Sequence, residues 1–85
     1  MSDLRFQFDA AVAASRQIGK MPDNATLLEL YALYKQATFG DVTGEPPPSY
    51  DFIEAAKHAA WEAKSGTTRD DAMAAYIALV TKLSA

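Results

Sequence analysis

The chain has 85 residues, of which 49% are hydrophobic and 22% are charged, and its formal net charge at pH 7 is −3. That length suits a single domain over residues 1–85, and that composition excludes a disordered chain. The acidic balance argues against a protein that neutralises many nucleic-acid phosphates, whereas a few well-placed cations could still bind one phosphorylated small molecule.

Cysteine is absent, which excludes disulfides, thiolate metal sites and cysteine nucleophiles. Residues 1–5 lack a basic region followed by an apolar stretch, and no apolar run approaches the ~18 residues of a membrane span. We therefore expect a cytoplasmic protein without stable membrane insertion.

Four segments have helical periodicity and none alternates like a strand, so we expect an all-α fold. The first helix is expected over residues 4–18, before Gly19 and Pro22. Its apolar stripe comprises Phe8, Ala11, Val12, Ser15 and Ile18. The second helix is expected to begin between residues 23 and 26 and to run towards residues 40 and 41.

A connection over residues 41–49 contains three consecutive prolines at 46–48, which cannot lie inside a helix. The third helix is expected to open at Asp51, with Glu54 completing a capping pair, and to continue through Lys64 before stopping at Gly66. The fourth is expected to start at Thr68. Its apolar face comprises Ala72, Met73, Tyr76, Ile77, Val80 and Leu83.

Catalytic and metal-binding patterns are missing from the sequence. His58 is the only imidazole, and a lone histidine on a helix is usually a packing or surface residue. The acidic pairs Asp51/Glu54 and Asp70/Asp71 stand at expected helix starts, where carboxylates cap the backbone donors. Residues 40–44 contain glycines but lack the lysine of a phosphate-binding nucleotide loop. We expect no enzyme activity, no metal and no cofactor.

The informative stretch lies in the second helix, where Tyr31, Tyr34 and Lys35 stand at i, i+3 and i+4 and share one face. Two phenols and an ammonium suit an adenosine phosphate. Lys57 and Tyr76 offer the same two chemistries on the third and fourth helices. The alternative interpretation is purely structural. Tyr31 and Tyr34 would then form an amphipathic stripe at the edge of the core, Lys57 would be a solvated charge, and Tyr76 would be a core residue.

Residues 31–41, YALYKQATFGD, resemble the YxxYKQAxxGD signature of the acyl-CoA-binding protein family. Further marks of that family follow in the same order: Phe8, Pro22, Asp51-Phe52, Ala56-Lys57, Trp61, Gly66 and residues 71–77. The resemblance implies a four-helix bundle of the up-down-down-up type with a shallow bowl for one acyl-CoA. It covers nearly the whole chain.

The resemblance also implies roles for individual residues. Tyr31, Tyr34, Lys35 and Lys57 would meet the adenine and the 3′-phosphate, Tyr76 would line the nucleotide and pantetheine part, Arg16 would lie near the head group, and Ala32 and Leu33 would belong to the binding segment. Phe8, Ala11, Val12 and Leu28 would form the bed for the acyl chain. The implied activity is that of a monomeric carrier and pool former for medium- and long-chain acyl-CoA esters in lipid metabolism.

The chain departs from the family pattern at two positions. It has Lys57-His58 where the family often has Lys-Trp, and Met21 where many members carry a lysine. A small helical module that docks a partner helix on Tyr31, Tyr34 and Tyr76 remains the alternative function. An enzyme, such as a thioesterase that acts on the same ligand, is a more distant alternative.

Overall fold

The structure is a computed structural model that describes residues 3–48 and 50–84, and within these ranges the chain forms four α-helices and no strand. They are α1 (Asp3–Ser15), α2 (Asn24–Phe39), α3 (Phe52–Glu62) and α4 (Arg69–Ser84). The predicted all-α fold is confirmed. Over the same residues, no helix combines the length and apolar character needed to cross a lipid bilayer.

Three helices begin at a side chain that caps the first turn. The Asp23 carboxylate accepts a hydrogen bond from the Thr26 N–H at 2.8 Å at the start of α2. Asp51 does the same for α3, accepting from the Glu54 N–H at 3.3 Å. At α4 the Thr68 hydroxyl accepts from the backbone N–H of residue 71 at 3.0 Å. Each oxygen satisfies a donor that has no partner inside the helix, so the predicted starts are confirmed.

Two helices end earlier than predicted. Helix α1 stops at Ser15 rather than residue 18, and the N–H groups of Arg16 and Gln17 bond to carbonyls three residues earlier. Helix α3 stops at Glu62 rather than residue 64, with the same three-residue bonds at Lys64 and at residue 65. Hydrogen bonds to a carbonyl three residues earlier form a 3₁₀ turn, which is tighter than an α-helical turn. The apolar stripe continues through this turn, so periodicity alone predicts a helix end that is too late.

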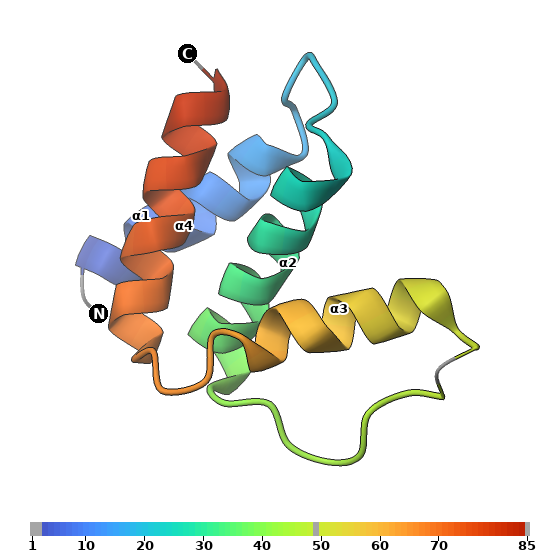
Figure 1. Ribbon diagram of the computed structural model, residues 1–85. Helices are drawn as coiled ribbons and strands as arrows, with labels where there is room; N and C mark the ends of the chain where they lie inside the picture. Colours follow the sequence, from blue (N-terminus) through green and yellow to red (C-terminus); the bar gives the residue numbers. More distant parts are fainter. Residues whose placement is uncertain (1–2, 49, 85) are drawn as a thin grey trace.

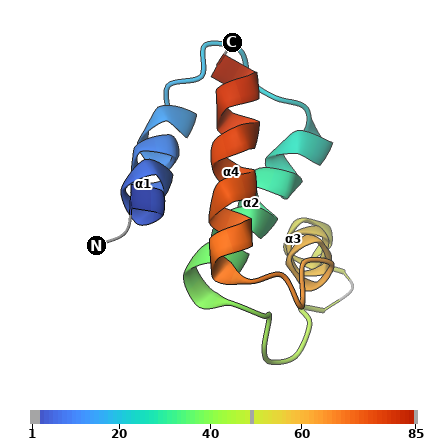
Figure 2. The same cartoon turned by 90° about the vertical axis from the view of Figure 1, so that its left-hand side faces the viewer.

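Helix α4 stands between α1 and α2 and packs against both, whereas α3 packs against α2 (Figure 1). Helices α1 and α4 run in one direction and α2 runs back in the other. Helix α3 lies crosswise and is seen nearly end-on in Figure 2. Helices α2 and α3 therefore meet near the C-terminus of α2 and diverge towards the N-terminus of α3.

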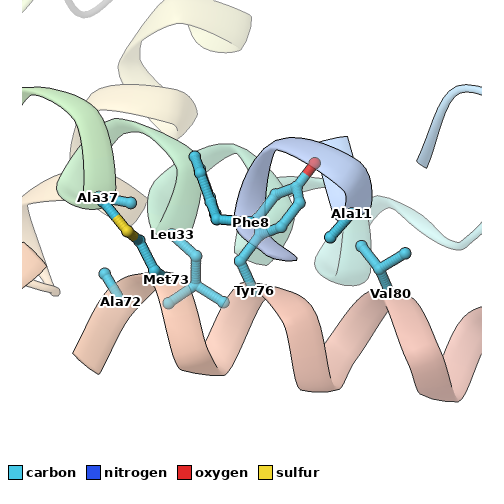
Figure 3. Close-up of a cluster of buried hydrophobic side chains, with 8 residues drawn as sticks. All are labelled: Phe8, Ala11, Leu33, Ala37, Ala72, Met73, Tyr76 and Val80. Atoms are coloured by element: carbon cyan, nitrogen blue, oxygen red, sulfur yellow. The ribbon is translucent and has the colours of Figure 1, made fainter. Parts of the chain in front are cut away.

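The hydrophobic core is built from α1, α2 and α4 (Figure 3). Its buried members are Phe8, Ala11, Leu33, Ala37, Ala72, Met73, Tyr76 and Val80. Small alanines on all three helices allow the backbones to approach closely around the larger side chains. Helix α3 contributes no buried residue to this core and, among the described helices, packs against α2 alone.

The C-terminus of α2 is joined to the segment between α3 and α4. Gly40 has φ 81°, in the left-handed region that glycine adopts without steric cost. Its carbonyl accepts a hydrogen bond from Trp61 Nε1 at 2.9 Å, and the Phe39 carbonyl accepts one from the Arg69 guanidinium at 3.2 Å. These bonds hold α3 and the start of α4 against the end of α2.

Candidate functional site

A groove of about 450 Å³ lies where α2 and α3 diverge. It is lined by Asn24, Leu27, Leu28, Tyr31, Phe52, Ile53, Ala56 and Lys57. The lining is largely apolar, and Phe52 and Ile53 are 80% and 71% exposed. An apolar wall with a few polar groups at one end is typical of a small-molecule site.

Two ammonium groups converge on the Tyr31 ring at this groove. Lys35 Nζ lies 5.8 Å from the centre of the ring, and Lys57 Nζ lies 5.4 Å from it. One lysine comes from α2 and the other from α3. Both distances are within the range of cation–π attraction, so the ring draws two positive charges together in a protein of negative net charge.

The two lysines differ in their ionic partners. Lys57 Nζ lies 3.6 Å from a carboxylate oxygen of Glu54, one turn earlier on α3, and both side chains are close to half exposed. Among residues 3–48 and 50–84, Lys35 has no ion pair. An exposed ion pair contributes little to stability, so the Lys57 charge stays available to an anionic ligand.

Tyr34 lies towards α1, away from the two lysines. Its ring stacks on Phe8 with centroids 6.1 Å apart, and it lies 6.4 Å from the Tyr76 ring. Tyr34 is 38% exposed. The shared face expected for Tyr31 and Tyr34 is therefore divided in the fold, because Tyr31 contacts Lys57 of α3 whereas Tyr34 contacts Phe8 of α1 and Tyr76 of α4.

Tyr76 lies in the core and is only 4% exposed. Its hydroxyl donates a hydrogen bond to Ser15 Oγ at 3.1 Å, and Ser15 Oγ donates to the Val12 carbonyl at 2.7 Å. Arg16 follows Ser15 directly, just beyond the end of α1, and its side chain is exposed. The phenol end of Tyr76 thus lies beside the chain segment that carries the Arg16 guanidinium.

Ala32 and Leu33 lie in the interior, at 0% and 4% exposure. Their side chains face the packed side of α2 rather than the groove. Of the residues predicted for the site, Tyr31 and Lys57 line the groove, and Lys35 approaches them over the Tyr31 ring. The fold separates them from the buried pair Ala32 and Leu33.

Of the four residues expected to form the bed for the acyl chain, two are buried: Phe8 and Ala11 are 1% and 8% exposed. Packing of α4 and α2 closes that side of α1. Val12 is partly buried against the core, and Leu28 alone of the expected four lines the groove.

The groove residues missed from sequence are Asn24, Leu27, Phe52, Ile53 and Ala56. One sequence signal could have found two of them. Phe52 and Ile53 follow the cap Asp51 immediately, and adjacent apolar residues in the first turn of a helix cannot both face a core. At least one of them must then meet solvent or a ligand.

A second groove, of about 610 Å³, lies between α1 and α4. Its lining comprises Phe6, Gln7, Ala10, Ala11, Ala14, Ile77, Val80, Thr81 and Ser84. None of these described residues is charged, so this groove has no cation for a phosphate. The smaller groove between α2 and α3 is the better candidate site despite its smaller volume.

The two departures from the family pattern lie outside the lysine pair. His58 Nε2 is buried and has no hydrogen-bond partner among the described residues. Met21 is 80% exposed in the connection between α1 and α2. Over residues 3–48 and 50–84, no three His, Asp or Glu side chains gather as metal ligands would.

A family model described as acyl-CoA-binding protein matches residues 6–80 of the chain. The chain belongs to the acyl-CoA-binding protein family. The "Acyl-CoA-binding protein homolog 1" of Caenorhabditis elegans is 44% identical over 82 residues, which cover 96% of this chain and 95% of that protein. The "Acyl-CoA-binding protein" of Saccharomyces cerevisiae is 42% identical over 78 residues, covering 92% and 90%.

The fold agrees with that membership. The crystal structure of Oryza sativa Acyl-CoA-Binding Protein 2 superposes with a TM-score of 0.90 at 35% identity, covering 94% of this chain and 89% of that one. The predicted four-helix bundle of this family is confirmed. The family is one of binding proteins rather than enzymes, in agreement with the expectation drawn from the sequence.

Proposed function

We propose that this protein binds one medium- or long-chain fatty acyl-CoA ester and carries it without chemical change. The convergence of Lys35 and Lys57 on Tyr31, at one end of an apolar groove, is the observation that supports this function most directly. Coenzyme A esters combine a phosphorylated nucleotide with a long apolar tail. The site offers one region for each part.

The head group would bind at the lysine pair. The 3′-phosphate carries negative charge and several acceptor oxygens, which two ammonium groups on different helices can contact together. Tyr31 and the exposed part of Tyr34 offer aromatic surface and hydroxyl groups to the adenine. Arg16 would add a cation at the edge beside Tyr76. The buried Ala32 and Leu33 would act through the packing of α2.

The acyl chain would lie in the groove between α2 and α3. Each buried methylene contributes about 0.8 kcal/mol, so eight of them would contribute roughly 6 kcal/mol before ordering costs. Contacts with the 3′-phosphate would distinguish coenzyme A from a free fatty acid. Tail burial thus supplies affinity, while the lysine pair supplies selectivity.

The physiological role proposed for this binding is that of a cytoplasmic carrier and pool former, acting as a monomer of one domain. His58, the only imidazole, has no acid–base partner among the described residues, and its ring nitrogen Nε2 is buried. Binding rather than turnover is therefore the activity. The exposed Phe52 and Ile53 would be covered by ligand instead of by a partner helix.

Isothermal titration with palmitoyl-CoA tests the proposal, with free palmitate and 3′-dephospho-palmitoyl-CoA as comparison ligands. We expect one-to-one binding of palmitoyl-CoA at micromolar Kd or tighter, about −8 kcal/mol or stronger. Both comparison ligands should bind more weakly. Lys35→Ala and Lys57→Ala should weaken palmitoyl-CoA binding, and Lys82→Ala, which removes an exposed lysine from α4, should not.

Absence of heat with palmitoyl-CoA would overturn the proposal and would favour the protein-interaction module. Equal affinity for palmitoyl-CoA and its 3′-dephospho form would overturn the head-group assignment. Release of free thiol during incubation would instead indicate a thioesterase.

A further inference from the structure

Phe39, the last residue of α2, has an unusual setting for a large apolar side chain, because its ring is 60% exposed. Burial in the core does not explain its position. The Lys35 ammonium lies 4.6 Å from the centre of the Phe39 ring and 5.6 Å from the Trp61 ring. The distance to Phe39 is the shortest of the four between a lysine ammonium and a ring in the described structure.

The two rings beside Lys35 are held at the junction of α2 and α3. Trp61 is fixed by the hydrogen bond from its Nε1 to the Gly40 carbonyl, and the Phe39 backbone by the Arg69 guanidinium. The Phe39 and Trp61 ring centres lie 6.2 Å apart at an angle of 51°. Lys35 therefore extends over rings that other bonds keep in place.

An aromatic ring and a carboxylate hold a cation in different ways. Glu54 offsets part of the Lys57 charge, since its carboxylate is itself an anion. A ring face attracts the ammonium through its quadrupole and carries no net charge, so the Lys35 charge is positioned without being neutralised. The three N–H donors of the ammonium are not consumed by a carboxylate partner and can meet a phosphate.

We infer that Phe39 is a positioning residue for head-group binding: with Trp61, its ring holds the Lys35 ammonium over aromatic faces beside Tyr31 of the groove, ready for the 3′-phosphate. This inference rests on the proposed function. Lysine has a flexible four-carbon stem, and holding it before the ligand arrives reduces the ordering cost of binding. Phe39 need not touch the ligand to have this effect.

Titration of two variants tests the role of the Phe39 ring. Phe39→Leu keeps apolar bulk but removes the π face, and Phe39→Tyr keeps the ring. Phe39→Leu should weaken palmitoyl-CoA binding about two- to fivefold. It should barely change the affinity for 3′-dephospho-palmitoyl-CoA, and Phe39→Tyr should restore wild-type binding. Phe6→Leu, which alters a phenylalanine of 70% exposure on α1, is the matched control and should have no effect.

A double substitution separates positioning from direct contact. In a Lys35→Met background, Phe39→Leu should cause no further loss of affinity, because no ammonium remains to be positioned. In the unliganded protein, the Lys35 ε-methylene protons should show an upfield ring-current shift in NMR spectra. That shift should shrink in Phe39→Leu and return in Phe39→Tyr.

The inference is overturned if Phe39→Leu binds palmitoyl-CoA with wild-type affinity, or if it lowers the affinities for palmitoyl-CoA and its 3′-dephospho form equally. It is also overturned if Phe39→Leu lowers the affinity further in the Lys35→Met background. Absence of the ring-current shift would overturn it as well, without any ligand. These failures leave the proposed function intact as long as the wild type discriminates between the two ligands. If the wild type does not discriminate, the head-group assignment fails, and this inference fails with it.

Discussion

Gln36, which is completely buried in α2, donates a hydrogen bond from Nε2 to a carboxylate oxygen of Asp41 at 2.7 Å. The same Nε2 donates to the Thr67 carbonyl at 2.7 Å, and the same Asp41 oxygen accepts from the Gly66 N–H at 2.9 Å. One amide and one carboxylate thus join the end of α2 to the segment before α4. The final part of the sequence signature therefore serves the fold, whereas Tyr31, at its start, lines the groove.

Removing the Gln36 amide should destabilise the protein. Gln36→Ala leaves buried acceptors with fewer donors and opens a cavity, so the free energy of unfolding should fall by about 1–3 kcal/mol. Urea unfolding measures this change. Gln17→Ala, which removes an exposed amide just beyond α1, should change the value by less than about 0.5 kcal/mol. Equal effects of the two substitutions would contradict the role given to Gln36.

Acid should weaken the fold through Asp41 and Asp23. The Gly66 N–H and then the Gln36 amide lower the pKa of Asp41, and hydrogen bonds from Thr26 lower the pKa of Asp23. The folded protein then binds fewer protons than the unfolded chain. This contribution to stability is complete above the unfolded pKa of about 3.9 and is lost as pH falls through the lower folded values.

Urea unfolding from pH 7 to pH 2 checks this dependence. The free energy of unfolding should decline below about pH 4, where unfolded aspartates begin to bind protons. Asp41→Asn should make the decline shallower, since its amide does not titrate there. Gln17→Ala, which removes no titrating group, should preserve the wild-type slope. An unchanged slope in Asp41→Asn would show that this carboxylate does not contribute.

Glu54 should compete with the ligand for Lys57. Lys57→Ala should weaken palmitoyl-CoA binding by about tenfold or more, because hydrogen bonds to charged groups contribute roughly 1.5–3 kcal/mol. Glu54→Gln should strengthen it about twofold, a small gain because the Glu54–Lys57 pair is exposed. Glu62→Gln removes the same charge from the other end of α3 and should leave affinity unchanged. A stronger effect at Glu62 than at Glu54 would indicate net charge rather than local competition.

Affinity should increase with acyl-chain length until the groove between α2 and α3 is filled. Each added methylene should tighten binding by about fourfold at most, from 0.8 kcal/mol per group, and the gain should then level off. Ile53→Ala should reduce the gain for long chains while leaving coenzyme A itself unaffected. Titration of a series of acyl-CoA esters checks both statements. A flat dependence on length would place the tail outside this groove.

The sequence alone determined the helices and the family. Periodicity, the caps at Asp23, Asp51 and Thr68, and the signature over residues 31–41 are signals between near neighbours, so they can be interpreted without the fold. The ends of α1 and α3 were placed too late because a tightened final turn keeps the same apolar pattern.

Only the tertiary structure decided how the site is assembled. Tyr31 and Tyr34 share one face by spacing, yet the two rings have different neighbours: Tyr31 contacts Lys57 of α3, and Tyr34 contacts Phe8 of α1. Phe8 belongs to the bed expected for the acyl chain, yet in the fold it is buried among residues of α2 and α4. The groove exists because α3 crosses α2 and diverges from it, and the angle between two packed helices depends on contacts between residues far apart in the chain.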